Sequence, residues 1–412
     1  MVLVDLIGFG IVLPLLPFYA SEFSATPTEI GLIFSIYSFA QLFFSPVWGS
    51  LSDRIGRRPI MLMSTFGAAI AYVIFGLAGS LWVLFASRLI AGIMGGNIST
   101  AMAYITDVTS KEDRAKGMGL IGAAFGIGFM IGPVITAGLI HPVFPGILEN
   151  AGLTGIAELV KTNRFEIPGF FAALLSLCSF FLVIFKLPET VDTKQASVTP
   201  SESEGKRASV FSPRFWKNLS AQSKVGGSGL LLAMMVAMFL QSFGQANLYS
   251  AFPLFCEAVL EMKPEEVSVQ FFYVGLIAVF IQGYLIRVLT KKFKETSLFL
   301  VGSLFMTAGV ALIGIADQVW MVTLFIGIMT IGNSLNMPTL TSLISQEAGE
   351  KNVGAVMGTS QGMAGLGRVI GPAWGGYLFS LSYGLPFFAT GVAISGMIWI
   401  GWRMGRQTRT SP

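Results

Sequence analysis

Charged residues are scarce in this chain of 412 residues: 12% are Asp, Glu, Lys or Arg, whereas 53% are hydrophobic. Soluble globular domains carry about 25% charged residues. With so few charges the chain cannot cover its surface with side chains that suit water, so most of the surface must face lipid. The net charge of +4 does not indicate a nucleic-acid partner, because nearly all the basic residues fall in loops on one side of the predicted membrane.

Cysteine and histidine are almost absent, and this excludes several kinds of chemistry. Cys178 lies inside an apolar run and Cys256 near the end of one, and two cysteines make no metal site or disulfide framework. The only histidine, His141, falls in a predicted loop. The sequence has no Gly-Lys-Ser/Thr phosphate loop and no nucleophile with a credible base. We therefore expect no enzyme activity, no metal and no cofactor, and we disfavour transport driven by ATP.

Long apolar runs, in contrast, are abundant. A helix that crosses the hydrocarbon core needs about 20 apolar residues, and twelve runs qualify. The predicted spans cover residues 1–20, 29–51, 60–79, 82–106, 117–140, 167–187, 228–255, 265–289, 296–315, 319–344, 354–380 and 384–403. The fold class is therefore an all-α membrane protein with twelve transmembrane helices. The first span starts at Met1 with no polar lead, which indicates a truncated or late-started chain rather than a signal peptide.

The distribution of basic residues predicts the orientation. With both termini in the cytoplasm, 21 of the 26 Lys and Arg residues lie on the cytoplasmic side and 3 in outer loops. Cytoplasmic loops of membrane proteins carry such an excess. We expect a multi-pass protein of the plasma or inner membrane, with an organelle membrane as the alternative.

A polar linker separates two sets of six spans. The prediction is an N-terminal six-helix half at 1–187, a cytoplasmic linker at 188–227 and a C-terminal six-helix half at 228–412. Within the linker, residues 212–219 suit either a short interfacial helix or a disordered segment with a few apolar residues. The long outer loop at 141–166 is expected to hold a short surface helix.

Glycine motifs repeat between the halves. Gly128, Gly132 and Pro133 in the fifth span match Gly367, Gly371 and Pro372 in the eleventh span, at an offset of 239 residues. Small residues allow close helix packing, which explains these glycines whatever the protein does. An even number of spans in each half predicts parallel halves, with a substrate site between them near the middle of the membrane.

The loop after the second span combines glycine, basic residues and one acid: Gly49-Ser-Leu-Ser-Asp53-Arg54-Ile-Gly56-Arg57-Arg58-Pro59. Gly49 permits close helix approach and Gly56 a tight turn. The arginines hold the loop in the cytoplasm, and setting topology is a sufficient role for Arg54 and Arg58. It does not explain the acid at Asp53.

This loop resembles the pattern G-x-L-x-D-R-x-G-R-R of the major facilitator superfamily. Within that superfamily the whole chain is similar to the twelve-span drug:proton antiporters, including the tetracycline-efflux type. The resemblance implies alternating access, in which Asp53, Arg57 and Asp107 form a charge relay that stabilises the outward-facing state. The alternative for Asp107 is a solvated loop residue.

Two ionisable residues inside spans are candidates for proton coupling. Arg88 lies in a stretch similar to a second motif of the superfamily, whose arginine is implicated in proton transfer, although this chain has Ala91 where glutamine is frequent. A snorkelling arginine is the alternative, because Arg88 is near the outer end of its span. Asp5 in the first span is either a titrating carboxylate or a structural residue at the start of a helix.

Polar side chains within the spans are candidates for a substrate cavity. They are Gln41, Asn97, Gln241, Gln245, Tyr249, Asn333, Asn336 and Arg368. Hydrogen bonding between helices is the alternative for each amide. The remaining lining would be apolar, which suits an amphipathic organic molecule.

The expected function is secondary active transport by alternating access, most simply proton-coupled export of an amphipathic organic compound or drug. The alternatives are a metabolite symporter or uniporter of the same fold and a non-transporting membrane receptor or scaffold. The expected partners are the lipid bilayer, a small-molecule substrate and protons, and the expected state is a monomer.

Overall fold

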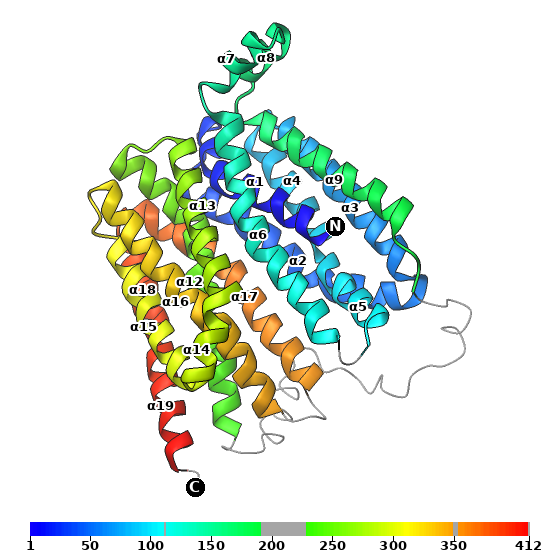
Figure 1. The fold of residues 1–412 in the computed structure, drawn as a ribbon. Coiled ribbons are helices and arrows are strands. Elements are labelled where there is room, and N and C mark those ends of the chain that lie inside the picture. Colours follow the sequence, from blue (N-terminus) through cyan, green and yellow to red (C-terminus); the bar gives the residue numbers. More distant parts are fainter. Residues whose placement is uncertain (111–112, 191–227, 349–352, 411–412) are drawn as a thin grey trace. The chain divides into compact units, whose positions relative to one another are not determined.

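A computed structural model describes residues 1–110, 113–190, 228–348 and 353–410, and each secondary-structure element in this part is helical (Figure 1). The predicted linker helix at 212–219 lies outside the described residues. By length and composition, eleven helices of the described part are able to cross a membrane. The glycine-rich α17 fills the remaining predicted span, so all twelve predicted spans correspond to helices in the described part.

The spans of the first half have these bounds: α1 (Val2–Glu22), α2 (Pro27–Ile55), α3 (Arg57–Gly76), α4 (Leu81–Met94) continued by the 3-10 turn η1 (Gly95–Asn97) and α5 (Ile98–Val108), α6 (Arg114–Ile140) and α9 (Glu166–Lys186). Between α6 and α9 the predicted surface helix is a pair, α7 (Phe144–Asn150) and α8 (Thr154–Thr162), which projects from the end of α6 (Figure 1).

The spans of the second half are α12 (Ser228–Leu260), α13 (Pro264–Phe280) continued by the π-helical turn η2 (Ile281–Leu285) and α14 (Ile286–Lys292), α15 (Glu295–Ile313), α16 (Val319–Ala348), α17 (Val353–Leu381), and α18 (Leu385–Ile394) with α19 (Gly396–Thr410).

The fourth span is interrupted, although its sequence predicts one helix over 82–106. The 3-10 turn η1 begins with the pair Gly95-Gly96, and glycine has the lowest helix propensity of all residues except proline. Neighbouring helices supply donors to carbonyls at the break: Gln41 Nε2 donates to Gly95 O at 3.0 Å, and Ser64 Oγ to Met94 O at 2.8 Å. Such a turn within a helix frequently marks a hinge.

The repeated glycine motifs pack against equivalent helices. A Cβ added to Gly132 of α6 would lie 2.5 Å from a backbone atom of Gly10 in α1. A Cβ added to Gly371 of α17 would lie 2.6 Å from the carbonyl oxygen of Phe243 in α12. Both contacts bring helix backbones together, as small residues allow in membranes. The fifth span thus packs on the first, and the eleventh on the seventh.

The other glycines of these motifs lie in the same contacts. Gly128 faces Leu6 and Ile7 of α1, and Gly367 faces Phe239 and Phe243 of α12. Pro133 and Pro372 follow within α6 and α17.

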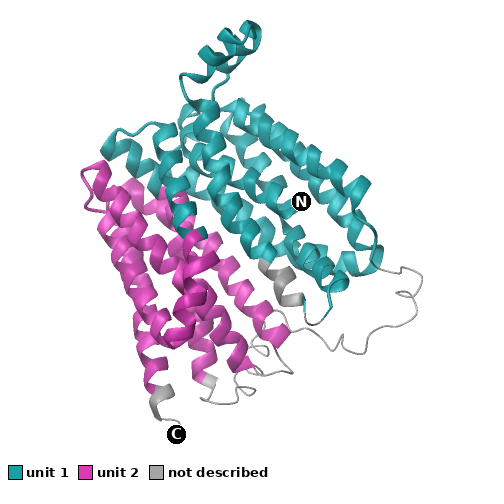
Figure 2. Cartoon of the chain, in the orientation of Figure 1, with its two compact units in different colours: residues 1–199, 252–279 teal, residues 200–251, 280–412 magenta. Residues whose placement is uncertain are grey.

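The chain forms two compact units (Figure 2). Unit 1 comprises Met1–Thr199 and Phe252–Val279, and unit 2 comprises Pro200–Ala251 and Phe280–Pro412. Helices α12 and α13 therefore each have one part in each unit. The division into halves at 187 and 228 rests on the sequence repeat and stays a prediction.

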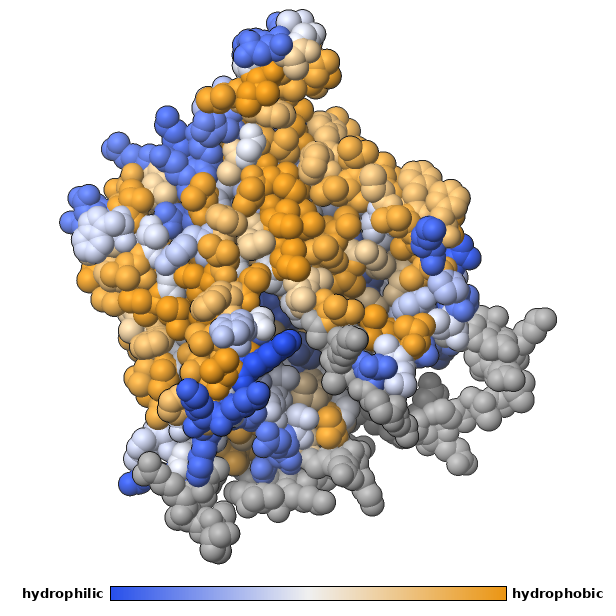
Figure 3. Space-filling model, in the orientation of Figure 1, coloured by the Kyte–Doolittle hydropathy of each residue, from blue (hydrophilic) through white to orange (hydrophobic). Residues whose placement is uncertain are grey.

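Large apolar side chains are exposed along the spans. Phe43 is 48% exposed, Phe185 77% and Val392 75%. Apolar side chains cover most of the face in Figure 3, over helices of both units. A lipid environment satisfies such a surface, since the backbone groups of the helices are paired internally.

Candidate functional site

The predicted loop 49–59 is almost wholly helical: α2 continues to Ile55 and α3 begins at Arg57, so the two helices meet at a tight corner. Gly56 separates the two helices with φ of 103°, a conformation that side chains rarely adopt. The carboxylate of Glu189 occupies the place where a Cβ at Gly56 would lie. Both the backbone angle and the neighbour therefore require glycine.

Arg57 is the centre of a charged cluster. Its Nη1 atom lies 2.6 Å from Asp53 Oδ1, and its Nε atom lies 3.1 Å from Asp107 Oδ2. Nη1 also donates to Ser52 Oγ at 2.6 Å. Arg57 is only 8% exposed, so this one guanidinium joins the end of α2, the start of α3 and the end of α5. The structure brings together all three residues of the expected charge relay.

Glu189 is a member of this cluster that the sequence analysis missed. Its carboxylate accepts hydrogen bonds from the backbone N–H groups of Arg57 at 2.9 Å and Arg58 at 3.1 Å. These are donors at the first turn of α3, where the helix dipole favours a negative charge. Thr190 Oγ1 donates to Asp107 Oδ2 at 3.2 Å. The sequence offered one signal for this contact. Gly56 has no side chain to cap the start of α3, so another residue has to supply the acceptor.

The side chains of Arg58 and Arg54, and Gly49, lie outside the contacts of the Arg57 guanidinium. Arg58 Nη2 donates to the carbonyl of Ile184 near the end of α9 at 2.6 Å, so Arg58 holds two helices together besides any role in topology. Arg54 is exposed. A Cβ on Gly49 would lie 3.6 Å from Ser99 Oγ of α5, an ordinary contact distance.

A buried polar cluster connects α1, α3 and the break in the fourth span. Asn97 Nδ2 donates to Asp5 Oδ2 at 2.9 Å and also to Ser64 Oγ. Asp5 Oδ1 is buried and has no hydrogen-bond partner among the described residues. Asp5 and Asn97 were predicted for different roles, proton coupling and substrate contact, and they form one unit.

Arg88 is 3% exposed, so its side chain does not snorkel to the surface of the protein. Its guanidinium lies over two aromatic rings of α3, 5.4 Å from the centre of Tyr72 and 4.8 Å from that of Phe75. A Cβ added to Gly8 of α1 would lie 2.6 Å from the Tyr72 hydroxyl. This tyrosine, which sequence reasoning missed, thus packs between Arg88 and the helix that carries Asp5.

Several cavity candidates of the second half interact with each other. Gln241 Nε2 lies 3.4 Å from Asn333 Oδ1, joining α12 and α16. Tyr249 of α12 and Arg368 of α17 interact electrostatically. Gln245, which lies between Gln241 and Tyr249 in the sequence of α12, is half-buried.

Two other candidates lie in helix contacts. Gln41 donates to the break in the fourth span, as described above. Asn336 is fully buried beside Gly302 of α15. Asn247, which was not predicted, is likewise fully buried and contacts Gly375 of α17. Helical spacing alone does not separate such amides from those that face a cavity.

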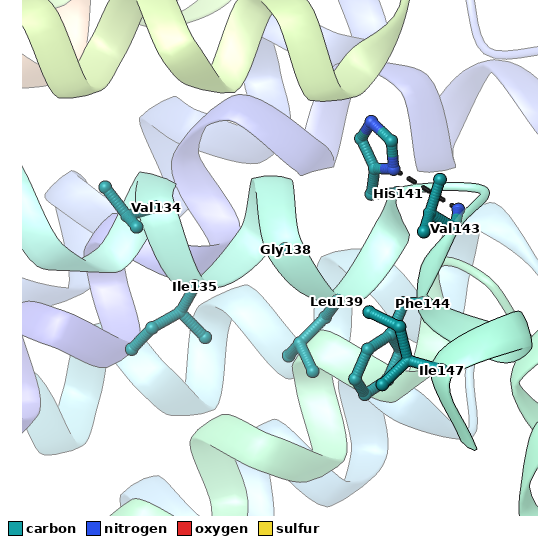
Figure 4. Close-up of a pocket in the computed structure, with 8 residues that line it drawn as sticks. All are labelled: Val134, Ile135, Gly138, Leu139, His141, Val143, Phe144 and Ile147. Atoms are coloured by element: carbon teal, nitrogen blue, oxygen red, sulfur yellow. Dashed lines mark hydrogen bonds between the residues drawn. The ribbon is translucent and has the colours of Figure 1, made fainter. Parts of the chain in front are cut away.

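A surface cavity of about 510 Å³ lies between the C-terminal end of α6 and α7 (Figure 4). Its lining is Val134, Ile135, Gly138, Leu139, His141, Val143, Phe144 and Ile147. His141 is exposed, and its Nδ1 accepts a hydrogen bond from Val143 N at 3.2 Å. The lining contains no predicted site residue. In the part of the chain that the structure describes, no group of three or more His, Cys, Asp or Glu residues is arranged to hold a metal ion.

Comparison with known proteins adds the family. The family model described as Major Facilitator Superfamily matches residues 1–372 and, in a second match, residues 288–411. This chain belongs to the Major Facilitator Superfamily. It is thus a multi-pass membrane transporter of small molecules and not an enzyme, as predicted.

Relatives within the superfamily match nearly the whole chain. The tetracycline resistance protein, class E, of Escherichia coli is 30% identical over 97% of this chain and 89% of its own. Multidrug resistance protein 2 of Bacillus subtilis (strain 168) is 26% identical over 97% of this chain and 93% of its own.

Solved structures support the superfamily fold. The human organic anion transporter MFSD10 (TETRAN) has a TM-score of 0.68 at 23% identity and covers 97% of this chain and 96% of its own. A bacterial homologue of the human lysosomal transporter Spinster, in an inward-facing and unoccupied conformation, has a TM-score of 0.73 at 16% identity and covers 98% of this chain and 95% of its own.

Proposed function

We propose that this transporter exports an amphipathic organic compound in exchange for protons. Relatives named for tetracycline resistance and multidrug resistance, which match along nearly the full length, support export of a drug-like molecule. They do not favour the metabolite symporter, the uniporter or the non-transporting receptor. The observation that carries the proton claim is the Asp5–Asn97 contact.

Asp5 is suited to bind and release a proton. Asn97 Nδ2 already donates to Oδ2, so a proton on Oδ1 leaves that hydrogen bond in place. Protonation removes the negative charge and so weakens the attraction between α1 and the amide of Asn97. Asn97 belongs to the 3-10 turn η1, where the fourth span is already interrupted. Binding of a proton at Asp5 thereby affects the residues at which the fourth span is interrupted.

Arg88 is a second candidate for proton coupling. It is 3% exposed and lies over the ring of Tyr72. The hydroxyl of Tyr72 lies against Gly8 of α1, the helix that carries Asp5. An ionisable side chain buried within a span is frequently functional.

The Arg57 cluster supplies the gating element of the proposal. It joins α2, α3 and α5 through Asp53 and Asp107. Glu189 adds a cap to the same cluster by accepting hydrogen bonds from the backbone N–H groups of Arg57 and Arg58. A corner of this kind is able to stabilise one conformation of the transport cycle, and Asp53, whose side chain is 63% exposed, is accessible for an exchange of partners.

Substrate contacts are proposed for Gln241, Asn333, Tyr249 and Arg368, which interact across α12, α16 and α17. A few polar groups in an otherwise apolar lining suit an amphipathic molecule. We further propose that both termini lie in the cytoplasm, which the distribution of basic residues supports. A monomer in a plasma or inner membrane completes the proposal.

Purified protein in liposomes tests the proposal. A candidate compound, such as tetracycline, is supplied outside, and an imposed pH jump should drive its uptake. In the Asp5→Asn variant the pH jump should no longer drive uptake, whereas exchange of labelled for unlabelled compound should persist, because that exchange needs no proton. The control is Asp317→Asn, which removes an acid from the short segment between α15 and α16. Uptake by the unaltered protein that ignores the pH jump would refute antiport.

A further inference from the structure

Arg164 joins three helices at the end of unit 1 that lies away from the 49–59 loop. Its Nε donates to the carbonyl of Ile140, the last residue of α6, at 2.8 Å. Its Nη2 lies 2.6 Å from Glu265 Oε2 in the first turn of α13. Arg164 itself lies two residues before the start of α9 at Glu166, whereas Arg58 binds near the other end of α9. The two ends of α9 are about 30 Å apart, so Arg164 lies at the outer end.

Glu265 makes this ion pair strong. It is only 7% exposed, and the positive end of the α13 dipole favours its carboxylate. Glu22 also interacts electrostatically with Arg164, but the short contact is with Glu265. Removal of Arg164 would leave the buried carboxylate of Glu265 uncompensated, which is strongly unfavourable.

The same two elements are in close contact deeper in the membrane. A Cβ on Gly275 of α13 would lie 2.6 Å from Met130 Cα of α6. A Cβ on Gly126 of α6 would lie 3.1 Å from Val279 of α13. Gly275 therefore permits a backbone approach that any side chain would prevent. Residues 252–279, which follow the linker in sequence, belong by packing to unit 1.

Helix irregularities border this segment at both ends. Pro253 lies in α12 directly after the change of unit at Ala251 and Phe252. The π-helical turn η2 at Ile281–Leu285 lies just after the change at Val279 and Phe280. Proline removes a helix hydrogen bond, and π turns are frequent at functional sites and kinks. Both helices are thus weakened where the segment meets the rest of the chain.

We propose that residues 252–279 form an outer gate that the Arg164–Glu265 ion pair holds closed. To open the substrate path to the outside, α13 leaves α6, with bending at Pro253 and at η2, and the ion pair breaks. Arg164 and Glu265 are positioning residues: they set how often the outer side opens. The inference rests on the proposed function in one respect, that a transporter must open to the outside. Its test measures this opening and requires no transport.

The reporter is a cysteine at Met130, which α13 covers in the closed gate. Met130→Cys is introduced together with Cys178→Ser and Cys256→Ala, so that it is the single thiol of the chain. The protein in lipid nanodiscs, without substrate or pH gradient, is treated with a charged maleimide, and the rate of alkylation is measured. A charged reagent reaches position 130 through water and not through lipid.

Arg164→Glu and Glu265→Arg should each raise this rate by at least about tenfold, because each places like charges in contact. The double exchange should return the rate to within about threefold of the starting protein, since it restores opposite charges but places a cation at the start of α13. The milder Glu265→Gln should raise the rate less and serves if a reversal fails to fold.

The matched control is Lys161→Glu, which reverses a charge of the neighbouring Lys161–Glu149 pair, a 2.6 Å contact between α7 and α8 only. Its rate should equal that of the starting protein. Rates that ignore both reversals, or that the double exchange does not lower, would overturn the gate. Because no substrate or proton takes part, failure of the antiport proposal would not affect this result.

Discussion

Asp53→Asn separates a structural from a functional role for the charged cluster. The substitution keeps the size of the side chain and removes its charge. Asp53 is 63% exposed in its side chain, and exposed ion pairs contribute about 0.2–1 kcal/mol to stability. Arg57 keeps its contacts with Asp107 at 3.1 Å and Ser52 at 2.6 Å. The free energy of unfolding should therefore fall by less than about 1 kcal/mol.

Transport should respond differently. If Asp53 exchanges partners during the cycle, the loss of its charge should slow proton-driven uptake at least about tenfold, equivalent to about 1.4 kcal/mol in the barrier. The assay compares initial uptake in liposomes with the apparent melting temperature of the same preparation. That temperature should change by less than about 3 °C. Glu149→Gln, which breaks the similarly exposed Glu149–Lys161 pair in α7 and α8, should change neither quantity.

Two outcomes would refute this reasoning. Uptake at the unaltered rate would show that the charge of Asp53 is dispensable. A loss of uptake accompanied by a large fall in melting temperature would show that Asp53 acts by holding the fold. As a positive comparison, Asp107→Asn should lower the melting temperature more than Asp53→Asn, because the Asp107 side chain is only 30% exposed.

Two further predictions concern stability. Glu189→Gln should destabilise the protein by about 1–2 kcal/mol, since the charged acceptor at the first turn of α3 becomes neutral; an unchanged melting temperature would contradict the capping role. Gly132→Ala should sharply reduce the yield of monodisperse protein in size-exclusion chromatography, because its Cβ would meet the backbone of Gly10, whereas Gly138→Ala in the same helix has nothing within 4 Å and should be neutral. Equal yields from both would contradict the close contact between α1 and α6.

Much of the fold was predictable because its main determinant is local. An apolar run of about 20 residues identifies a span wherever it occurs, and the helices agree with the predicted spans to within a few residues in most cases. The interruptions were not predictable. Gly95-Gly96 and the turn at 281–285 lie in apolar runs, and their backbone geometry depends on donors such as Gln41 from other helices.

The site was predictable where it follows a local motif. Asp53 and Arg57 are four residues apart, and the family resemblance added Asp107. Glu189 was assigned to the linker, because its contact with α3 spans more than 130 residues of sequence. Asn336 and Asn333 show another limit: both were expected at a cavity, but Asn336 packs against Gly302 of α15. A polar residue in a span indicates an interaction, but not its partner.

The contact of Glu189 with the corner at Gly56 has a practical consequence for dividing this chain into two fragments. A cut at residue 187 follows the apparent end of the sixth span, yet it assigns the acceptor for the Arg57 and Arg58 backbone to the wrong fragment. The same cut also separates Thr190 from Asp107, to which the Thr190 hydroxyl donates a hydrogen bond. Fragments intended to reassemble in the membrane should therefore be separated after residue 190, so that the first fragment carries its own complete corner.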